Sequence, residues 1–109
     1  MTINNERALS LISLSAKAGK CVSGGFMTEK SIQEGLAALV IIANDASDNT
    51  KKKFSDKCKY YDIPFVFLAD GDTLGHRIGK QSRMVIAIND NNFAKQIICK
   101  LDSSIDMEV

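Results

Sequence analysis

Two adjacent glycines, Gly24 and Gly25, stand between a short apolar segment (residues 20–22) and a stretch of residues compatible with a helix. The first N–H groups of a helix have no partner within it, and the helix dipole adds partial positive charge beside them. Glycine also lets another backbone approach such a helix start closely. Lys30 follows in the same stretch and can reach back beside this opening. The arrangement is typical of a site that binds an anion such as phosphate.

Two other segments carry polar side chains suited to phosphates or bases. Asn44 begins a polar loop (residues 44–47) after a continuous apolar run. Residues 79–83 form a basic loop that contains Lys80, Ser82 and Arg83. A guanidinium donates a fork of hydrogen bonds, which suits both phosphate groups and base edges. For the glycine turn and for the basic loop alike, an ordinary turn without a ligand is the alternative interpretation.

Positive charge is concentrated before the last eight residues. The net charge is +1, but residues 102–109 hold three acidic residues and no basic one, which leaves 14 basic and 10 acidic residues in the remainder. This balance permits nucleic acid as a partner without requiring it. A helix-compatible stretch adds a lysine cluster, which is either a solvated face or a secondary phosphate contact. Its members are Lys51, Lys52, Lys53, Lys57 and Lys59.

Residue types needed for catalysis or metal binding are sparse. The P-loop motif requires a glycine directly before its lysine, and the stretch at residues 24–30 lacks it. The cysteines Cys21, Cys58 and Cys99 are far apart, and His76 is the one histidine. The acidic residues fall where helix caps are expected. We therefore expect no catalytic residue, no metal site, no cofactor and reduced thiols.

Length and hydropathy favour a soluble protein. A chain of 109 residues with 45% hydrophobic and 25% charged residues is typical of one globular domain, here residues 1–101, and residues 102–109 are expected to form a flexible acidic tail. The longest apolar run, residues 36–43, is far shorter than the about 20 residues of a membrane span. The N-terminus has no apolar signal core. We expect a cytoplasmic monomer without membrane contact.

Helical and strand patterns alternate along the chain, each helix beginning at a capping residue or after a glycine. This alternation predicts a three-layer α/β/α sandwich, with a central mixed four-stranded sheet and helices on both faces. Sites in such folds lie in loops beyond the strand ends, here residues 23–25, 44–47 and 79–83. Predicted helices cover about residues 5–16, 26–34, 48–61, 71–78 and 91–101, and predicted strands cover residues 21–23, 38–43, 65–68 and 84–88.

Motifs along nearly the whole chain follow the pattern of one known family. They are residues 20–24, Lys30, residues 43–47, Asn49, Thr50, Lys52, Lys53, residues 56–58, Tyr60, Tyr61, Leu74, Gly75, residues 78–80, Arg83, Val85, Ala87, Phe93 and Ala94. On these residues, from about residue 8 to residue 101, the chain resembles the kink-turn RNA-binding superfamily that includes archaeal ribosomal protein L7Ae. Within that superfamily, it is most similar to the bacterial YlxQ branch.

The resemblance implies an α/β/α sandwich that binds kink-turns, which are RNA helices bent sharply at an internal loop with tandem G·A pairs. The family's first motif runs Gly, any residue, Asn, Glu, two residues and Lys, and Gly24 and Lys30 match it. Phe26 stands where Asn reads a guanine, and Met27 stands at the Glu position. Phe26 offers no hydrogen bond to a base edge, but its ring can stack on an unpaired base. The implied RNA-binding residues are Ser23, Gly24, Gly25, Phe26, Lys30, Asn44, Lys80, Ser82 and Arg83.

We therefore expect a non-enzymatic RNA-binding protein whose partner is structured RNA, in or around the ribosome. The alternative is a protein-interaction module on the same fold, in which Phe26 and Met27 form an apolar contact patch. A third hypothesis is a nucleotide-binding or hydrolytic enzyme that uses the same glycine turn. The missing P-loop glycine argues against that third hypothesis.

Overall fold

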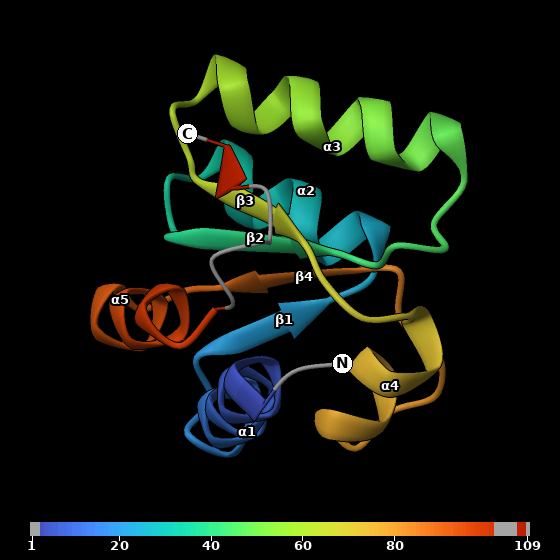
Figure 1. Cartoon of the computed structure of the whole chain (residues 1–109). Coiled ribbons are helices and arrows are strands. Elements are labelled where there is room, and N and C mark those ends of the chain that lie inside the picture. Colours follow the sequence, from blue (N-terminus) through green and yellow to red (C-terminus); the bar gives the residue numbers. More distant parts are fainter. Residues whose placement is uncertain (1–2, 102–106, 109) are drawn as a thin grey trace.

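The computed structural model describes residues 3–101 and 107–108, and it describes side chains for residues 5–101. Helices and strands alternate along the chain as the sequence predicts, and one further strand follows the last helix (Figure 1). The elements are α1 (Ile3–Lys17), β1 (Cys21–Ser23), α2 (Gly25–Gln33), β2 (Leu39–Ile42), α3 (Asp48–Tyr60), β3 (Phe65–Phe67), α4 (Gly71–Arg77), β4 (Val85–Ile88), α5 (Asn91–Cys99) and β5 (Met107–Glu108).

The strands form one mixed sheet in the order β1-β4-β2-β3-β5. Strands β2 and β3 are parallel, and β4 runs antiparallel to both β1 and β2. Consequently the C-terminal ends of β1, β2 and β3 lie at the same end of the sheet as the first residue of β4. The three loops singled out in the sequence, residues 23–25, 44–47 and 79–83, therefore lie at the same end of the molecule.

The sheet differs from the predicted one by a short fifth strand. Met107 and Glu108 pair antiparallel with Val66 and Phe65 at the outer edge of β3. Two residues are too short for a strand pattern to be recognised in the sequence, and the open edge of β3 supplies the partner groups. The expectation of a flexible tail concerns residues 102–109, of which residues 102–106 and 109 lie outside the described residues.

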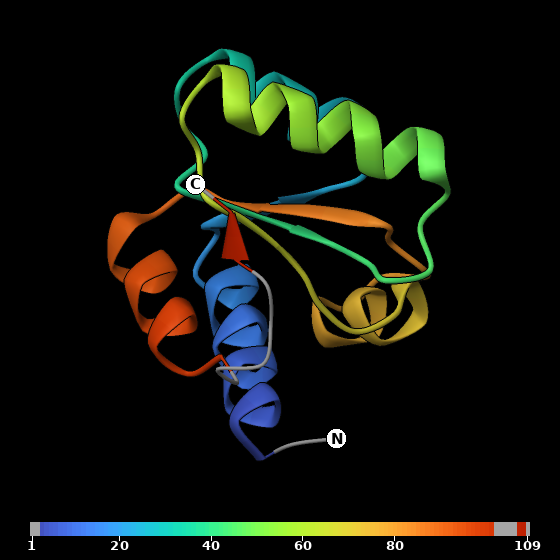
Figure 2. The ribbon, with the colours of Figure 1, turned by 45° about the horizontal axis from the view of Figure 1, so that its top comes forward.

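Helices cover both faces of the sheet, which makes the predicted α/β/α sandwich. Helices α2 and α3 lie on one face, while α1, α4 and α5 lie on the other (Figures 1 and 2). Along β2, Leu39 and Ile41 pack into the core beneath α1, α4 and α5, while Val40 and Ile42 pack beneath α2 and α3. All four are fully buried, which explains the continuous apolar run.

Side chains cap three of the helices. The Ser47 hydroxyl accepts a hydrogen bond from the N–H of Thr50 at 3.1 Å, before α3. Asp70 and Asp90 cap α4 and α5 in the same way, over 2.6 and 2.8 Å. Helix α2 differs because its N-cap residue is Gly24, which has no side chain to satisfy the first N–H groups.

Candidate functional site

Helix α2 begins with its first N–H groups uncapped. Gly24 has φ 87° and ψ 160°, a left-handed conformation that favours glycine. Its N–H donates to the carbonyl of Val85 in β4 at 2.9 Å, which fixes the helix start against the sheet. The first helical bond joins the N–H of Thr28 to the Gly24 carbonyl at 3.0 Å. The N–H groups of residues 25–27 precede that bond and are oriented for an external acceptor.

A hollow of about 560 Å³ lies beside this helix start, and we call it the α2 hollow. It combines the end of β1, the first turn of α2, one side of α3 and the segment before β4. Six of its residues were singled out from the sequence: Ser23, Gly24, Gly25, Phe26, Ser82 and Arg83. The others are Met27, Thr50, Lys53, Phe54, Met84 and Val85.

Arg83 connects the two sides of the α2 hollow. Its Nε donates to the Ser23 hydroxyl at 3.1 Å, and its Nη1 donates to the Ser82 carbonyl at 3.0 Å. The backbone N–H of Arg83 also donates to the carbonyl of Gly71 at 2.9 Å. The guanidinium is therefore held at the end of β1, and within the described residues its Nη2 makes no hydrogen bond.

Phe26 is largely exposed at the start of α2. Its side chain is 77% exposed, and that of Met27 is 42% exposed. Phe26 also lines a smaller adjoining hollow of about 340 Å³, together with Lys30, Glu29 and Gln33. Phe26 therefore lies between the α2 hollow and Lys30, which itself does not line the α2 hollow.

Two other residues singled out from the sequence also lie outside this lining. Asn44 is exposed, and its N–H donates to the Ala69 carbonyl at 2.7 Å. Lys80 is exposed as well, and its N–H donates to the carbonyl of Gly75 at 2.8 Å. Both lie at the loop end of the sheet, but neither side chain faces into the hollow.

Two glycines of α4 hold the basic loop in place, a role that was not predicted from the sequence. A Cβ on Gly75 would lie 1.7 Å from the carbonyl oxygen of Gln81, and a Cβ on Gly71 would lie 2.8 Å from the Ser82 hydroxyl. The N–H of Gly71 donates to a carboxylate oxygen of Asp45 at 2.9 Å, which ties in the loop at residues 44–47. Glycines four residues apart in a short helix are the sequence signal for this close approach.

The lysine cluster of α3 is partly engaged in ion pairs. Glu29 of α2 lies 3.0 Å from the ammonium of Lys53 and 3.3 Å from that of Lys57. These lysines hold the pKa of Glu29 below its usual value, with the Lys53 hydrogen bond as the largest cause. Lys53 also lines the α2 hollow, so one member of the cluster joins the site and the cluster as a whole does not.

Side chains that could bind a metal ion do not gather in the described part of the chain. No group of three histidine, cysteine or acidic side chains there could hold a metal ion. Burial raises the pKa of Cys21 to about 11 and that of Cys58 to about 12, so both thiols stay protonated and poorly nucleophilic at neutral pH. Among the described residues, no helix is long and apolar enough to cross a membrane.

Curated proteins similar to this chain come from bacteria and archaea. The RNA-binding protein YlxQ of Bacillus subtilis (strain 168) is 42% identical over 92 residues, which cover 84% of this chain and 92% of that protein. The RNA-binding protein YlxQ of Enterococcus faecium is 43% identical over 93 residues, covering 85% and 89%. The large ribosomal subunit protein eL8 of Thermoplasma acidophilum is 25% identical over 103 residues, covering 94% and 85%.

Solved structures share the fold. A protein with unknown function from Bacillus halodurans C superposes with a TM-score of 0.83 at 37% identity, covering 86% of this chain and 95% of that one. The Giardia lamblia 15.5kD RNA binding protein gives a TM-score of 0.77 at 24% identity, covering 92% and 89%, and supports the fold alone. The model of the Ribosomal protein L7Ae/L30e/S12e/Gadd45 family matches residues 6–98. The chain therefore belongs to that family, as its sequence motifs indicated.

Proposed function

We propose that this protein is a non-enzymatic RNA-binding protein that recognises structured, kink-turn-like RNA in or around the ribosome. The α2 hollow carries the proposal, because it places an uncapped helix start, a held guanidinium and an exposed aromatic ring side by side. The names of the similar proteins, RNA-binding and ribosomal, support it. We further propose that residues 1–101 act as one unit, as a monomer in the cytoplasm.

Phosphate contacts supply most of the affinity in this proposal. The N–H groups of residues 25–27 donate hydrogen bonds to one phosphate group, since a helix start favours an anion. Arg83 and Lys53 line the same hollow, and Lys30 lies just beyond Phe26. Each phosphate held by a cation releases counterions from the RNA, so binding weakens as salt rises. Lys80, Ser82 and Asn44 add contacts at the rim of the same end of the sheet.

Selectivity comes from RNA shape and from stacking. Phe26 has no group that reads a base edge, yet its exposed ring lies directly beside the proposed phosphate site. An aromatic ring stacks on an unpaired base with little dependence on base identity. The Ser23 hydroxyl accepts a hydrogen bond from the Nε of Arg83, so it orients the guanidinium toward the RNA backbone. We therefore expect a preference for bent RNA with an extruded base.

The first experiment titrates the protein into a labelled kink-turn RNA and into a straight duplex of equal length, at two salt concentrations. Tighter binding to the kinked RNA at both salt concentrations supports the proposal. Equal, weak binding to both RNAs that salt abolishes would show only nonspecific contact with a basic surface and would refute shape recognition.

Lys30→Ala should weaken kink-turn binding and flatten its salt dependence. Lys95→Ala on α5 is the matched control.

A protein-interaction module is the second candidate function. The exposure of Phe26 and Met27, two large apolar side chains in one helix turn, favours it. Under this hypothesis, the protein shows no preference for kinked RNA, and substitution of Phe26 abolishes capture of a protein partner. The titration above therefore separates the two candidates.

A further inference from the structure

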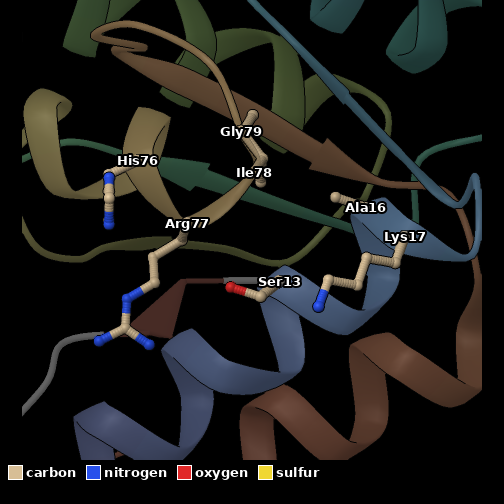
Figure 3. Close-up of a pocket in the computed structure, with 7 residues that line it drawn as sticks. All are labelled: Ser13, Ala16, Lys17, His76, Arg77, Ile78 and Gly79. Atoms are coloured by element: carbon tan, nitrogen blue, oxygen red, sulfur yellow. The ribbon is translucent and has the colours of Figure 1, made fainter.

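A second hollow, of about 570 Å³, lies between α1 and α4, and we call it the α1–α4 groove (Figure 3). Its polar side chains are Ser13 and Lys17 from α1 and His76 and Arg77 from α4. In the view of Figure 3, Ser13 lies between the ammonium of Lys17 and the guanidinium of Arg77. Two helices thus present cationic side chains to one shared space.

The cations of this groove differ in their partners. Arg77 forms an ion pair with Glu6 of α1, so its charge is partly neutralised. Lys17 is exposed, and within the described residues its ammonium has no carboxylate partner. A guanidinium, an ammonium and a hydroxyl that face one space suit the oxygens of a phosphate group. His76 is the one ring in its lining, which holds no Phe, Tyr or Trp side chain.

The groove and the α2 hollow lie on either side of the loop at residues 79–83. Gly79 belongs to the wall of the groove, Lys80 is exposed, and Ser82 and Arg83 line the α2 hollow. One short loop therefore separates the two hollows and contributes to both. This loop offers a nucleic acid strand one path from the α2 hollow, across the exposed Lys80, to the wall of the groove at Gly79.

We propose that the α1–α4 groove is a second RNA contact, which binds backbone phosphates of the helical stem that leads away from the bend. This inference rests on the proposed function. Contacts to phosphates carry no sequence information, so the groove adds affinity and orients the stem without adding sequence preference. Lys17 is its principal cation because Arg77 is already paired with Glu6.

The test uses two RNAs with the same kink-turn, one with a short stem and one with that stem extended by about one helical turn. Dissociation constants are measured for the wild-type protein and for Lys17→Gln at several salt concentrations. We expect the wild type to bind the extended RNA more tightly. Lys17→Gln should weaken that binding several-fold and reduce the salt slope by about 0.7–0.9, which corresponds to one lost phosphate contact. Its affinity for the short-stem RNA should not change.

Two controls separate this contact from a structural role. Lys95→Gln removes an exposed lysine from α5 and should leave both affinities unchanged. Lys17 also lies in the last turn of α1, where a cation favours the helix dipole. A purely structural role would lower the melting temperature of Lys17→Gln without lowering its affinity for extended RNA relative to short RNA. Lys17→Arg keeps the positive charge and should retain tight binding to the extended RNA.

Equal affinity of the wild type for the two RNAs would overturn the inference, as would an unchanged affinity of Lys17→Gln for the extended RNA. Both results leave the proposed function intact, because the kink-turn itself is still bound. If the wild-type protein binds neither RNA, the proposed function fails and the groove contact fails with it. The outcomes are therefore distinguishable.

Discussion

The two hollows that flank the loop at residues 79–83 are built differently. The α2 hollow combines parts of several elements, and its cations are already held, Arg83 by Ser23 and Lys53 by Glu29. The α1–α4 groove lies between two helices, and its Lys17 makes no ion pair in the described part of the chain. Groups held in advance lose less side-chain entropy on binding, whereas an unpaired lysine that contacts phosphate adds affinity without sequence information. This difference fits the two roles that we propose, recognition in the α2 hollow and a supporting contact in the α1–α4 groove.

The largest expected effect comes from Gly75→Ala, because the shared loop would be displaced from both hollows. In an ordinary helix, this change stabilises by about 0.5–1 kcal/mol. Here the new Cβ would meet the backbone of Gln81, so we expect destabilisation of about 1–3 kcal/mol instead. For a chain of this size, that corresponds to a fall in Tm of roughly 5–20 °C, which thermal unfolding measures. RNA affinity should fall for short and extended stems alike.

Gly25→Ala is the matched control for this change. A Cβ on Gly25 would meet only the ring of Phe54, at an ordinary 4.0 Å, and Gly25 does not have a left-handed φ. We expect its Tm to stay the same or to rise slightly. If Gly75→Ala were as stable as Gly25→Ala, the close packing of the loop on α4 would be wrong.

Phe26→Ala should affect the α2 hollow and leave the α1–α4 groove unchanged. The ring is 77% exposed, so its removal should change Tm little. If the ring stacks on a base, affinity for kink-turn RNA should fall by about 1–3 kcal/mol, or roughly 5- to 150-fold. Phe26→Tyr retains the ring and should retain the affinity. Equal affinity of the wild type and Phe26→Ala for kink-turn RNA would exclude stacking by this ring.

The smallest effect is expected for Glu29→Gln, which tests whether the cations of the α2 hollow are held in advance. Removing the carboxylate frees Lys53 and Lys57 to contact phosphate, so RNA affinity should rise by a few-fold at most, since exposed ion pairs are weak. The salt slope should steepen at the same time. A loss of affinity would instead show that Glu29 positions Lys53 for the RNA.

The pH dependence of the same pair gives a second measurement. The pKa of Glu29 is lowered in the folded protein, so the pair contributes to stability above the usual carboxyl pKa and loses that contribution as pH falls through the lowered value. The wild type and Glu29→Gln should therefore differ in Tm near neutral pH and converge in acid. Parallel curves over the whole range would argue against a stabilising pair.

Much of the fold could be predicted from local patterns. The buried run of β2 and the caps Ser47, Asp70 and Asp90 each follow from a few neighbouring residues. The short strand β5 could not, because its partner groups come from β3, which is distant in the sequence. A strand of two residues depends on an available edge and carries no recognisable period of its own.

The candidate site, like the fold, could be predicted from the sequence only in part. The glycine start of α2 and the basic loop could be singled out because uncapped helix starts and guanidinium groups have a recognisable chemistry. The place of Lys53 in the α2 hollow and the packing of Gly75 on Gln81 could not, because each joins segments whose contact no local spacing reveals.

The sequence by itself determined the chemistry that each segment carries and the helix or strand that presents it, since both depend on side-chain type and on short-range period. Only the tertiary structure decided which segments meet. The antiparallel insertion of β4 between β1 and β2 brings Arg83 to Ser23 and the loop at residues 79–83 to the start of α2. That order of strands depends on the burial of apolar side chains from many segments in the two parts of the core. The site therefore depends on packing between segments that are distant in the sequence.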